Sequence, residues 1–198
     1  MSKKSYLPPT LIFTIITIFM TVFTTITTAY SLTIDNSASS FQWTASKLAG
    51  KHTGKIFIKS SQLKEGNVAN KSDFTSTSGT VVMDMESITV EDLSGEMAQK
   101  FLGHIKNDDF FQVNKYPTAT LKMVKIGKNE IEGELTIKDK TNPVKFSYSK
   151  NDQLITGILK FDRTKFNMIY GSGNFFKNLG DKVIHDEVVL EFKVKLIL

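Results

Sequence analysis

The sequence contains no cysteine and only one arginine, and these two scarcities exclude several classes of protein. Without cysteine the chain forms no disulfide, no thiolate metal site and no lipid anchor attached through a cysteine. A nucleic-acid surface usually clusters its basic residues and favours arginine for contacts with phosphates and bases. Here Arg163 stands alone and the lysines lie scattered among acids, in a chain of net charge +5. We therefore expect no nucleic-acid binding.

The sequence also lacks the residue spacings that metal binding and catalysis require. Its three histidines, His52, His104 and His185, lie in separate segments and form no HxH or HExxH pair. No serine stands in a GxSxG context, and the GSGNFF stretch (171–176) lacks the GxGxxG pattern of a phosphate cradle. We expect that stretch to be a flexible loop at a rim, and we expect no catalytic set, no metal site and no cofactor.

One long uncharged stretch is present, and it lies at the N-terminus. Lys3 and Lys4 precede an uncharged run from Leu7 to about Thr28, and small residues follow up to Ala29. This order predicts a secretory signal peptide over residues 1–29, removed from a mature domain at 30–198. An uncleaved membrane anchor is the alternative, although threonines interrupt the run throughout. The prediction places the protein in the periplasm or outside the cell.

From Leu32 onward the hydrophobic residues recur with a period of two, which is the pattern of a strand with one dry face. The C-terminal segment is the clearest case, since five apolar residues from Val188 to Leu196 alternate with Glu191, Lys193 and Lys195. Strict alternation is typical of antiparallel sheets. Turns are expected at 65–67, 127–129, 139–143 and 151–153, spacings short enough for hairpins, and a polar loop at 66–79.

A single helix is expected near 94–105, because Met97, Phe101, Leu102 and Ile105 fall three or four residues apart and share one face. Ser94 suits the N-cap position. Two acids, Asp108 and Asp109, then precede an exposed-looking aromatic pair, Phe110 and Phe111. The segment predicts a lid over one end of a sheet, and the adjacent acids at 108–109 and 186–187 are expected to be exposed.

Seven or eight such strands with one helix favour an all-β fold. A closed antiparallel up-and-down barrel of about eight strands removes exposed edges, which a sandwich does not. We therefore predict a lipocalin-like barrel with one short helix, in addition to the signal helix at the N-terminus. A barrel of this size has an interior that side chains fill or that holds one small ligand.

Four stretches of the chain resemble the YceI-like family of lipid- and polyisoprenoid-binding proteins. The segment HIKNDDFFQVNKYPTATLKM (104–123) is similar to a signature that links helix and strand in this family, and 34–56, 134–146 and 162–176 match in the same order. The resemblance covers about 32–198. It implies a long apolar cavity that encloses a polyisoprenoid or other long-chain lipid, bound non-covalently and without further cofactor.

The dry positions mix bulky aromatics with flexible methionines, which adapt to irregular apolar shapes. Periodicity alone favours a simply filled core, whereas the resemblance implies that these positions form the walls of the cavity. The expected ligand-binding residues are Phe41, Trp43, Ile56, Ile58, Met83, Met85, Phe110, Leu121, Met123, Phe146, Tyr148, Phe161, Arg163, Phe166 and Phe192.

Arg163 has two interpretations. Its guanidinium could meet a ligand head group, or it could pair with Asp162 or another acid and hold the turn at 162–164. The structural role is favoured, because the family motif places this arginine at a strand end.

The first hypothesis is a non-enzymatic protein that binds, transports or stores a long-chain isoprenoid or lipid. The alternative is a filled barrel that serves as an envelope stress or protein-interaction module, with Phe110 and Phe111 contacting a partner. A third is an enzyme acting on lipidic or quinone substrates, with Tyr148 or His104 as proton donor. Transient membrane contact and a homodimer are compatible with the first hypothesis.

Overall fold

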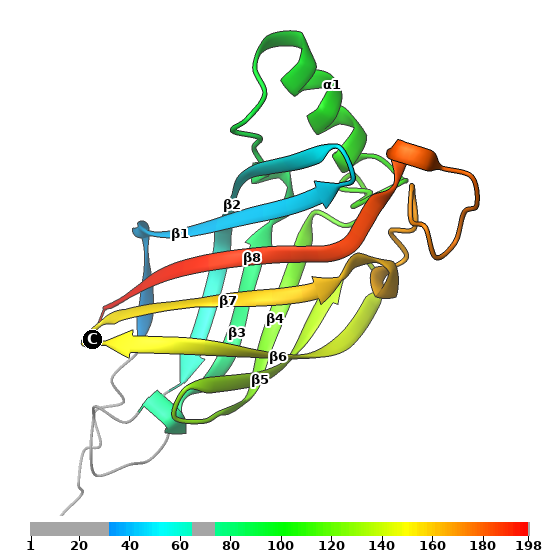
Figure 1. Ribbon diagram of the computed structural model, residues 1–198. Helices are drawn as coiled ribbons and strands as arrows, with labels where there is room; N and C mark the ends of the chain where they lie inside the picture. The colour runs from blue at the N-terminus through cyan, green and yellow to red at the C-terminus, as the bar shows by residue number, and fades with distance from the viewer. Residues whose placement is uncertain (1–31, 65–73, 198) are drawn as a thin grey trace, which may run out of the picture.

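The computed structural model describes residues 32–64 and 74–197, and these residues form a closed antiparallel barrel (Figure 1). Each strand pairs with its neighbours in sequence, and β1 pairs with β8 to close the sheet. The strands are β1 (Thr33–Lys47), β2 (Gly50–Lys64), β3 (Ser78–Asp84), β4 (Thr118–Ile126), β5 (Glu130–Ile137), β6 (Lys140–Asn151), β7 (Leu154–Asp162) and β8 (Ile184–Ile197). The prediction of an eight-stranded up-and-down barrel is confirmed.

One α-helix, α1 (Gly95–Lys106), and four short 3₁₀ helices complete the elements of the described residues. The 3₁₀ helices are η1 (Phe74–Ser76), η2 (Met85–Ser87), η3 (Arg163–Phe166) and η4 (Gly180–Lys182). No helix in this part of the chain is both long and apolar enough to cross a membrane. The expected signal peptide at 1–29 and the turn at 65–67 lie outside the described residues.

The alternation seen in the sequence sets the inside and outside of the barrel. On β5, Ile131, Leu135 and Ile137 are buried, while the three glutamates of the strand lie on the outer face. Two of those glutamates, Glu130 and Glu134, form ion pairs with lysines of β6 and β4. Opposite faces of one strand therefore meet the core and the solvent, as a period of two requires.

The barrel has two different ends, which we call the helix end and the terminal end. The helix end carries the β1–β2 turn, α1 with its flanking segments, and the segment between β7 and β8; the terminal end carries the start of β1 and the end of β8 (Figure 1). Phe101, Leu102 and Ile105 of α1 pack against the core at the helix end. The expected lid is thus present over that end.

Three details of the predictions are wrong. Met97 does not share the buried face of α1, since its side chain is 65% exposed in the first turn of the helix. Phe110 and Phe111 are not exposed but half-buried and packed against the core. Residues 74–79 are not all loop, because η1 forms there with Phe74 buried and β3 begins at Ser78. Ser94 does occupy the N-cap position of α1, but its side chain makes no capping hydrogen bond.

The expected turn at 139–143 is shorter than predicted. The chain reverses at Lys138 and Asp139, where Lys138 takes a positive φ of 57°, and β6 already begins at Lys140. Pro143 lies inside β6, opposite Glu134 of β5. Proline has no N–H to donate, and β6 pairs with β7 only from Ser147 onward, so Pro143 sits where the strand has a neighbour on one side.

The segment at 87–92 covers the edge of β2 where that strand does not reach β3. Thr89 donates its backbone N–H to Lys55 (2.9 Å) and Glu91 donates to Thr53 (2.8 Å). Gly54 lies between these contacts, and a Cβ added to it would stand 1.9 Å from the Thr89 carbonyl oxygen. A glycine is therefore required for this close approach of two backbones.

Replacing Gly54 with alanine tests this contact. The clash is with backbone atoms and cannot be relieved by a rotamer change, so Gly54→Ala is expected to lower the free energy of unfolding by about 3 kcal/mol. The matched control is Gly103→Ala on α1, where an added Cβ meets nothing within 4 Å. That control is expected to stabilise by about 0.5–1 kcal/mol. Urea denaturation gives both values, and equal stabilities of the two variants would contradict the packing argument.

The same segment contributes a pH-dependent contact. Burial alone would raise the pKa of Asp92, but hydrogen bonds from the Thr53 N–H (2.8 Å) and from His52 (2.7 Å) outweigh it, so the pKa lies below its ordinary value. A carboxyl group whose pKa is depressed by folding stabilises above its unfolded pKa of about 3.9. That contribution is lost as the pH falls through the folded pKa.

Asp92→Asn imitates the protonated carboxyl and is expected to destabilise at pH 7 by roughly 0.5–1 kcal/mol, a value reduced by solvent screening. The difference from the unchanged protein should vanish near pH 2. Thermal unfolding from pH 2 to 7 measures it, with the exposed turn variant Asp152→Asn as control. A difference between Asp92→Asn and the unchanged protein that stays constant over this range would refute the assignment.

Candidate functional site

The barrel encloses an apolar cavity of about 100 Å³. Side chains from all eight strands and from η1 line it, and every one of them is apolar. The lining residues are Ile34, Phe41, Leu63, Phe74, Val81, Met83, Leu121, Met123, Ile131, Leu135, Phe146, Ile155, Leu159, Leu190, Phe192, Val194 and Leu196. A concave site without a polar group selects for hydrocarbon and offers nothing to orient a polar ligand.

Aromatic rings narrow this cavity. The Phe192 ring lies over Gly157 of β7, where an added Cβ would stand 2.4 Å from the ring. Phe41 stacks against Phe192 with ring centroids 6.4 Å apart, and Phe146 meets the same ring edge-on at 5.7 Å. The glycine therefore gives the Phe192 ring room to lie against β7, and the three rings pack together on one part of the cavity wall.

Six of the expected ligand-binding residues line the cavity. They are Phe41, Met83, Leu121, Met123, Phe146 and Phe192. Most of the other lining residues stand at dry positions of the same strands. The alternation therefore predicted that they are interior, but not that they line the cavity. Phe74 differs, because it comes from a stretch whose polar sequence gave no sign of a buried aromatic.

The remaining expected residues lie elsewhere in the core. Trp43 stacks on Phe101 of α1 (6.2 Å) and donates its indole N–H to the Thr89 carbonyl oxygen (3.1 Å). Tyr148 donates its hydroxyl to the Gly127 carbonyl oxygen at the terminal end (2.7 Å). The indole N–H and the phenolic hydroxyl are therefore hydrogen-bonded to the protein backbone and do not point into the cavity.

The other members of this group are also placed outside the cavity lining. Ile56 is buried opposite Phe41, and Ile58 is half-buried opposite Met83. Met85 is buried in η2, beside the chain that enters β4. The rings of Phe161 and Phe166 meet edge-on at 5.6 Å.

Arg163 is the most heavily bonded side chain at the helix end, and it is only 2% exposed. Its Nε donates to the His185 carbonyl oxygen (3.0 Å), and its Nη1 donates to the carbonyl oxygens of Met168 and Tyr170. Its Nη2 donates to the Ile184 carbonyl oxygen (3.0 Å) and to Asp186 Oδ1 (3.2 Å). A guanidinium has five N–H donors, and all five are used.

This arrangement gives Arg163 a structural role and leaves no donor for a ligand head group. Burial lowers the pKa of Arg163, and the nearby carboxylates of Asp186 and Asp162 oppose that shift. Asp162 caps η3 by accepting from the Thr164 N–H (2.9 Å), so the pairing acid is Asp186 rather than its sequence neighbour. Phe110 lies over the guanidinium, 6.0 Å from ring centroid to Cζ, and thus at the helix end outside the cavity.

Two expectations about this end are corrected. Asp186 is not an exposed solubilising acid, because it pairs with Arg163 and accepts hydrogen bonds from Ser172 Oγ (2.9 Å) and Asn174 Nδ2 (2.7 Å). The GSGNFF stretch does lie at a rim of the barrel, but its second residue, Ser172, is fully buried and anchors it. The residues that hold it come from β8, more than ten positions away, which a local motif does not reveal.

Two of the three histidines, His52 and His104, pair with acids. His52 contacts Asp92 (2.7 Å), and His104 contacts Asp109 (3.2 Å) and meets the rings of Phe110 and Tyr170 edge-on. Within 32–64 and 74–197, no three potential metal ligands of the His, Cys, Asp or Glu type come together.

Exchange of Arg163 for lysine tests the structural role. An ammonium group offers three donors in place of a fork of five, so at least two buried acceptors lose their partner, and Arg163→Lys is expected to cost about 2–4 kcal/mol of unfolding free energy. Its exposed neighbour provides the control, since Lys165→Arg should change stability by less than about 0.5 kcal/mol. Urea denaturation measures both, and hydrogen exchange at Ser172 should quicken in the first variant alone. If Arg163→Lys is as stable as the unchanged protein, the hydrogen-bond network contributes little to the free energy of unfolding.

Comparisons with known proteins agree with this geometry. The structure of BcnA from Burkholderia cenocepacia superimposes with a TM-score of 0.62 at 23% identity, covering 83% of this chain and 99% of that one. A polyisoprenoid binding domain from Saccharophagus degradans, implicated in plant cell wall breakdown, gives a TM-score of 0.56 at 12% identity, covering 84% and 97%. At these identities the two likenesses show a shared fold.

No curated protein matches the chain. The family model described as the YceI-like domain matches residues 32–196, which is nearly the whole barrel. The chain therefore belongs to the YceI-like domain family.

Proposed function

We propose that this protein is a non-enzymatic binder of a long-chain lipid of the polyisoprenoid type, which it carries or stores inside its barrel. The observation that supports the proposal most directly is the cavity, whose lining is apolar on every strand. The name of the Saccharophagus degradans domain, a polyisoprenoid binding domain of the same fold, is consistent with it.

The energetics favour a long ligand. Burial of each methylene contributes about 0.8 kcal/mol, whereas association costs roughly 4–15 kcal/mol of lost freedom. A chain of about eight to ten carbons would only offset that cost. Because the cavity offers no hydrogen-bond partner, hydrocarbon length is the main source of affinity.

The cavity must widen to admit such a chain. A volume of about 100 Å³ is well below the roughly 300–1,000 Å³ of a typical ligand pocket. A ligand would therefore displace side chains, and Met83 and Met123 in the lining are the residues best suited to rearrange. The energy of this repacking is subtracted from the affinity.

The small volume also supports a second candidate, a filled barrel that acts as an envelope stress or interaction module without lipid. The two candidates differ in one observable, which is the content of the purified protein. Organic extraction and mass spectrometry of protein made in a membrane-rich host should release a long-chain lipid if the first proposal is right.

The apolar leader suggests that the barrel works outside the cytoplasm, and we propose export to the periplasm or beyond after cleavage near Ala29. N-terminal sequencing of the protein recovered from its native cell envelope tests this step.

Blocking the cavity should abolish lipid binding. Val81 lines the cavity on β3, so Val81→Phe is expected to weaken binding of cis-parinaric acid, a fluorescent long-chain fatty acid, by about tenfold or more, since several methylenes lose their place. The control is Val124→Phe, the same change at a position of β4 that faces solvent. Fluorescence titration measures both, and melting temperatures show that both variants fold.

Enlarging the same cavity provides the opposite test to blocking it. Leu121→Ala is expected to cost about 2–4 kcal/mol of stability in the free protein, and parinaric acid should restore part of that loss by filling the space. If Val81→Phe binds the probe as tightly as the unchanged protein, the cavity is not the binding site.

A further inference from the structure

The segment between β7 and β8 exposes two adjacent aromatic side chains. Phe175 is 56% exposed and Phe176 is 45% exposed, in a loop that projects beyond the barrel at the helix end (Figure 1). Large apolar groups exposed side by side mark surfaces that other molecules cover.

The loop is held firmly despite this exposure. The N–H groups of Phe175 and Phe176 both donate to the Ser172 carbonyl oxygen, at 3.1 and 3.0 Å. Ser172 is itself fully buried and bonded to Asp186, the partner of Arg163. The network around the only arginine of the chain thus fixes the backbone that presents the two rings.

A third exposed apolar side chain belongs to the β1–β2 turn, which contacts the same residue as this loop. Leu48, in the β1–β2 turn, is 68% exposed, and its N–H donates to the Val183 carbonyl oxygen (3.2 Å). The loop approaches the same residue, since a Cβ on Gly173 would stand 3.6 Å from Val183 Cγ1. We call Leu48, Phe175 and Phe176 the apolar tip.

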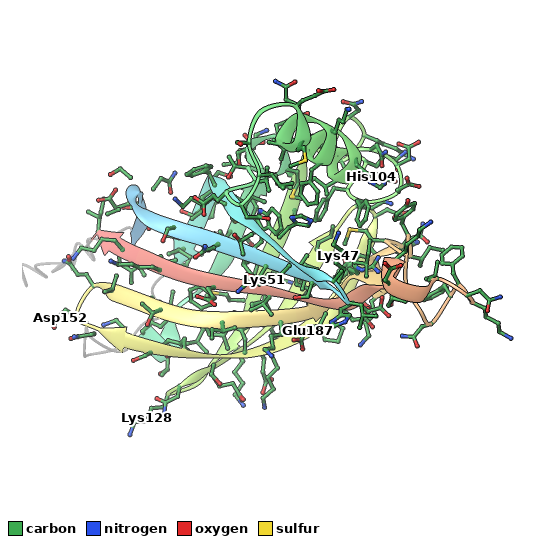
Figure 2. The ribbon with its side chains drawn as sticks, turned by 45° about the horizontal axis from the view of Figure 1, so that its top comes forward. Lys47, Lys51, His104, Lys128, Asp152 and Glu187 are labelled. Atoms are coloured by element: carbon green, nitrogen blue, oxygen red, sulfur yellow. The ribbon has the colours of Figure 1, made fainter. Side chains whose placement is uncertain are left out.

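Four lysines come from the same two segments as the apolar tip. Lys47 and Lys51 come from the β1–β2 hairpin, and Lys177 and Lys182 follow the two phenylalanines; all four are exposed. Among the described residues none of the four forms an ion pair within 4 Å. Of the acids on the same segments, Glu187 is paired with Lys160 (3.1 Å) and Asp186 with Arg163 (3.2 Å), while Asp181 is exposed and offsets one of the four positive charges. Figure 2 shows Lys47 and Lys51 at the helix end, and Lys128 and Asp152 toward the other end.

We propose that the apolar tip docks onto the surface of an anionic lipid bilayer. Aromatic and aliphatic side chains lie well at the headgroup level, while lysines around them are attracted to anionic headgroups. A projecting tip of three apolar residues is too small for a typical protein interface of about 800 Å² per partner, but it suits insertion among lipids. This surface lies at the opposite end from the start of β1, and its docking does not depend on the cavity holding lipid.

The test locates the docked end on the full chain. Because the protein has no cysteine, Gly173→Cys carries an environment-sensitive NBD label at the tip, and Lys128→Cys carries it at the terminal end. Vesicles of phosphatidylcholine with 30% phosphatidylglycerol should shift and brighten the label at 173 but not at 128. Phosphatidylcholine alone should produce less than about a tenth of that response, because the electrostatic attraction is missing.

Two double variants separate the contributions. Phe175→Ser with Phe176→Ser, and Lys177→Glu with Lys182→Glu, should each weaken the response at 173 by about tenfold or more. The matched control is Phe57→Ser with Ile158→Ser, two similarly exposed apolar residues on the barrel wall, which should leave it unchanged. Melting temperatures check folding in each case.

Several outcomes would overturn the proposal. They are a silent label at 173, a stronger response at 128, an equal response to neutral vesicles, or equal loss in the control variant. A response of the 173 label to polyglutamate but not to vesicles would assign the tip to an acidic protein instead. Lipid extraction and parinaric acid binding test the cavity separately, so failure of one proposal leaves the other standing.

Discussion

Closure of the sheet through β1 is the constraint on which the structure depends. β1 pairs with β2 along Phe41–Lys47 and with β8 along most of its length, so one strand joins the two edges that an open sheet would expose. Closure gives hydrogen-bond partners to the backbone N–H and C=O groups of the two edges. It also creates a compartment whose walls are the dry faces of all eight strands. The apolar cavity follows from closure and alternation together, without any residue dedicated to it.

The same constraint limits what the compartment can hold. A barrel of eight strands is narrow, and the side chains that line this one leave a free volume of only about 100 Å³. If the barrel binds lipid as proposed, affinity for hydrocarbon and stability of the empty barrel compete, because each side chain that packs the empty core is one that a ligand must move. Methionine in the lining eases this competition, since its conformations are many and close in energy.

The strands, the helix and the inward faces of the strands could be predicted from the sequence, because these features follow from local periodicity. The position of a side chain along the barrel axis could not be predicted in this way. Trp43 and Phe161 were therefore expected in the cavity, although they pack at the helix end. The partners of Arg163 could not be predicted either, since those on β8 lie more than twenty positions away in the sequence. Contacts between distant segments depend on register and crossing geometry, which no short motif encodes.

The two ends of the barrel differ in a way that bears on access to the cavity. The helix end is packed with Met85, Val113, Phe166 and Met168, all nearly inaccessible, and it is tied by the Arg163 network. At the terminal end, the described pairs between β1 and β2 stop at Phe41 and Ile56, and none joins residues 33–40 to residues 57–64. Since widening a wall costs least where fewest hydrogen bonds cross it, a ligand of the kind proposed would displace the wall most easily between these two strands, where Ile34 and Leu63 line the cavity.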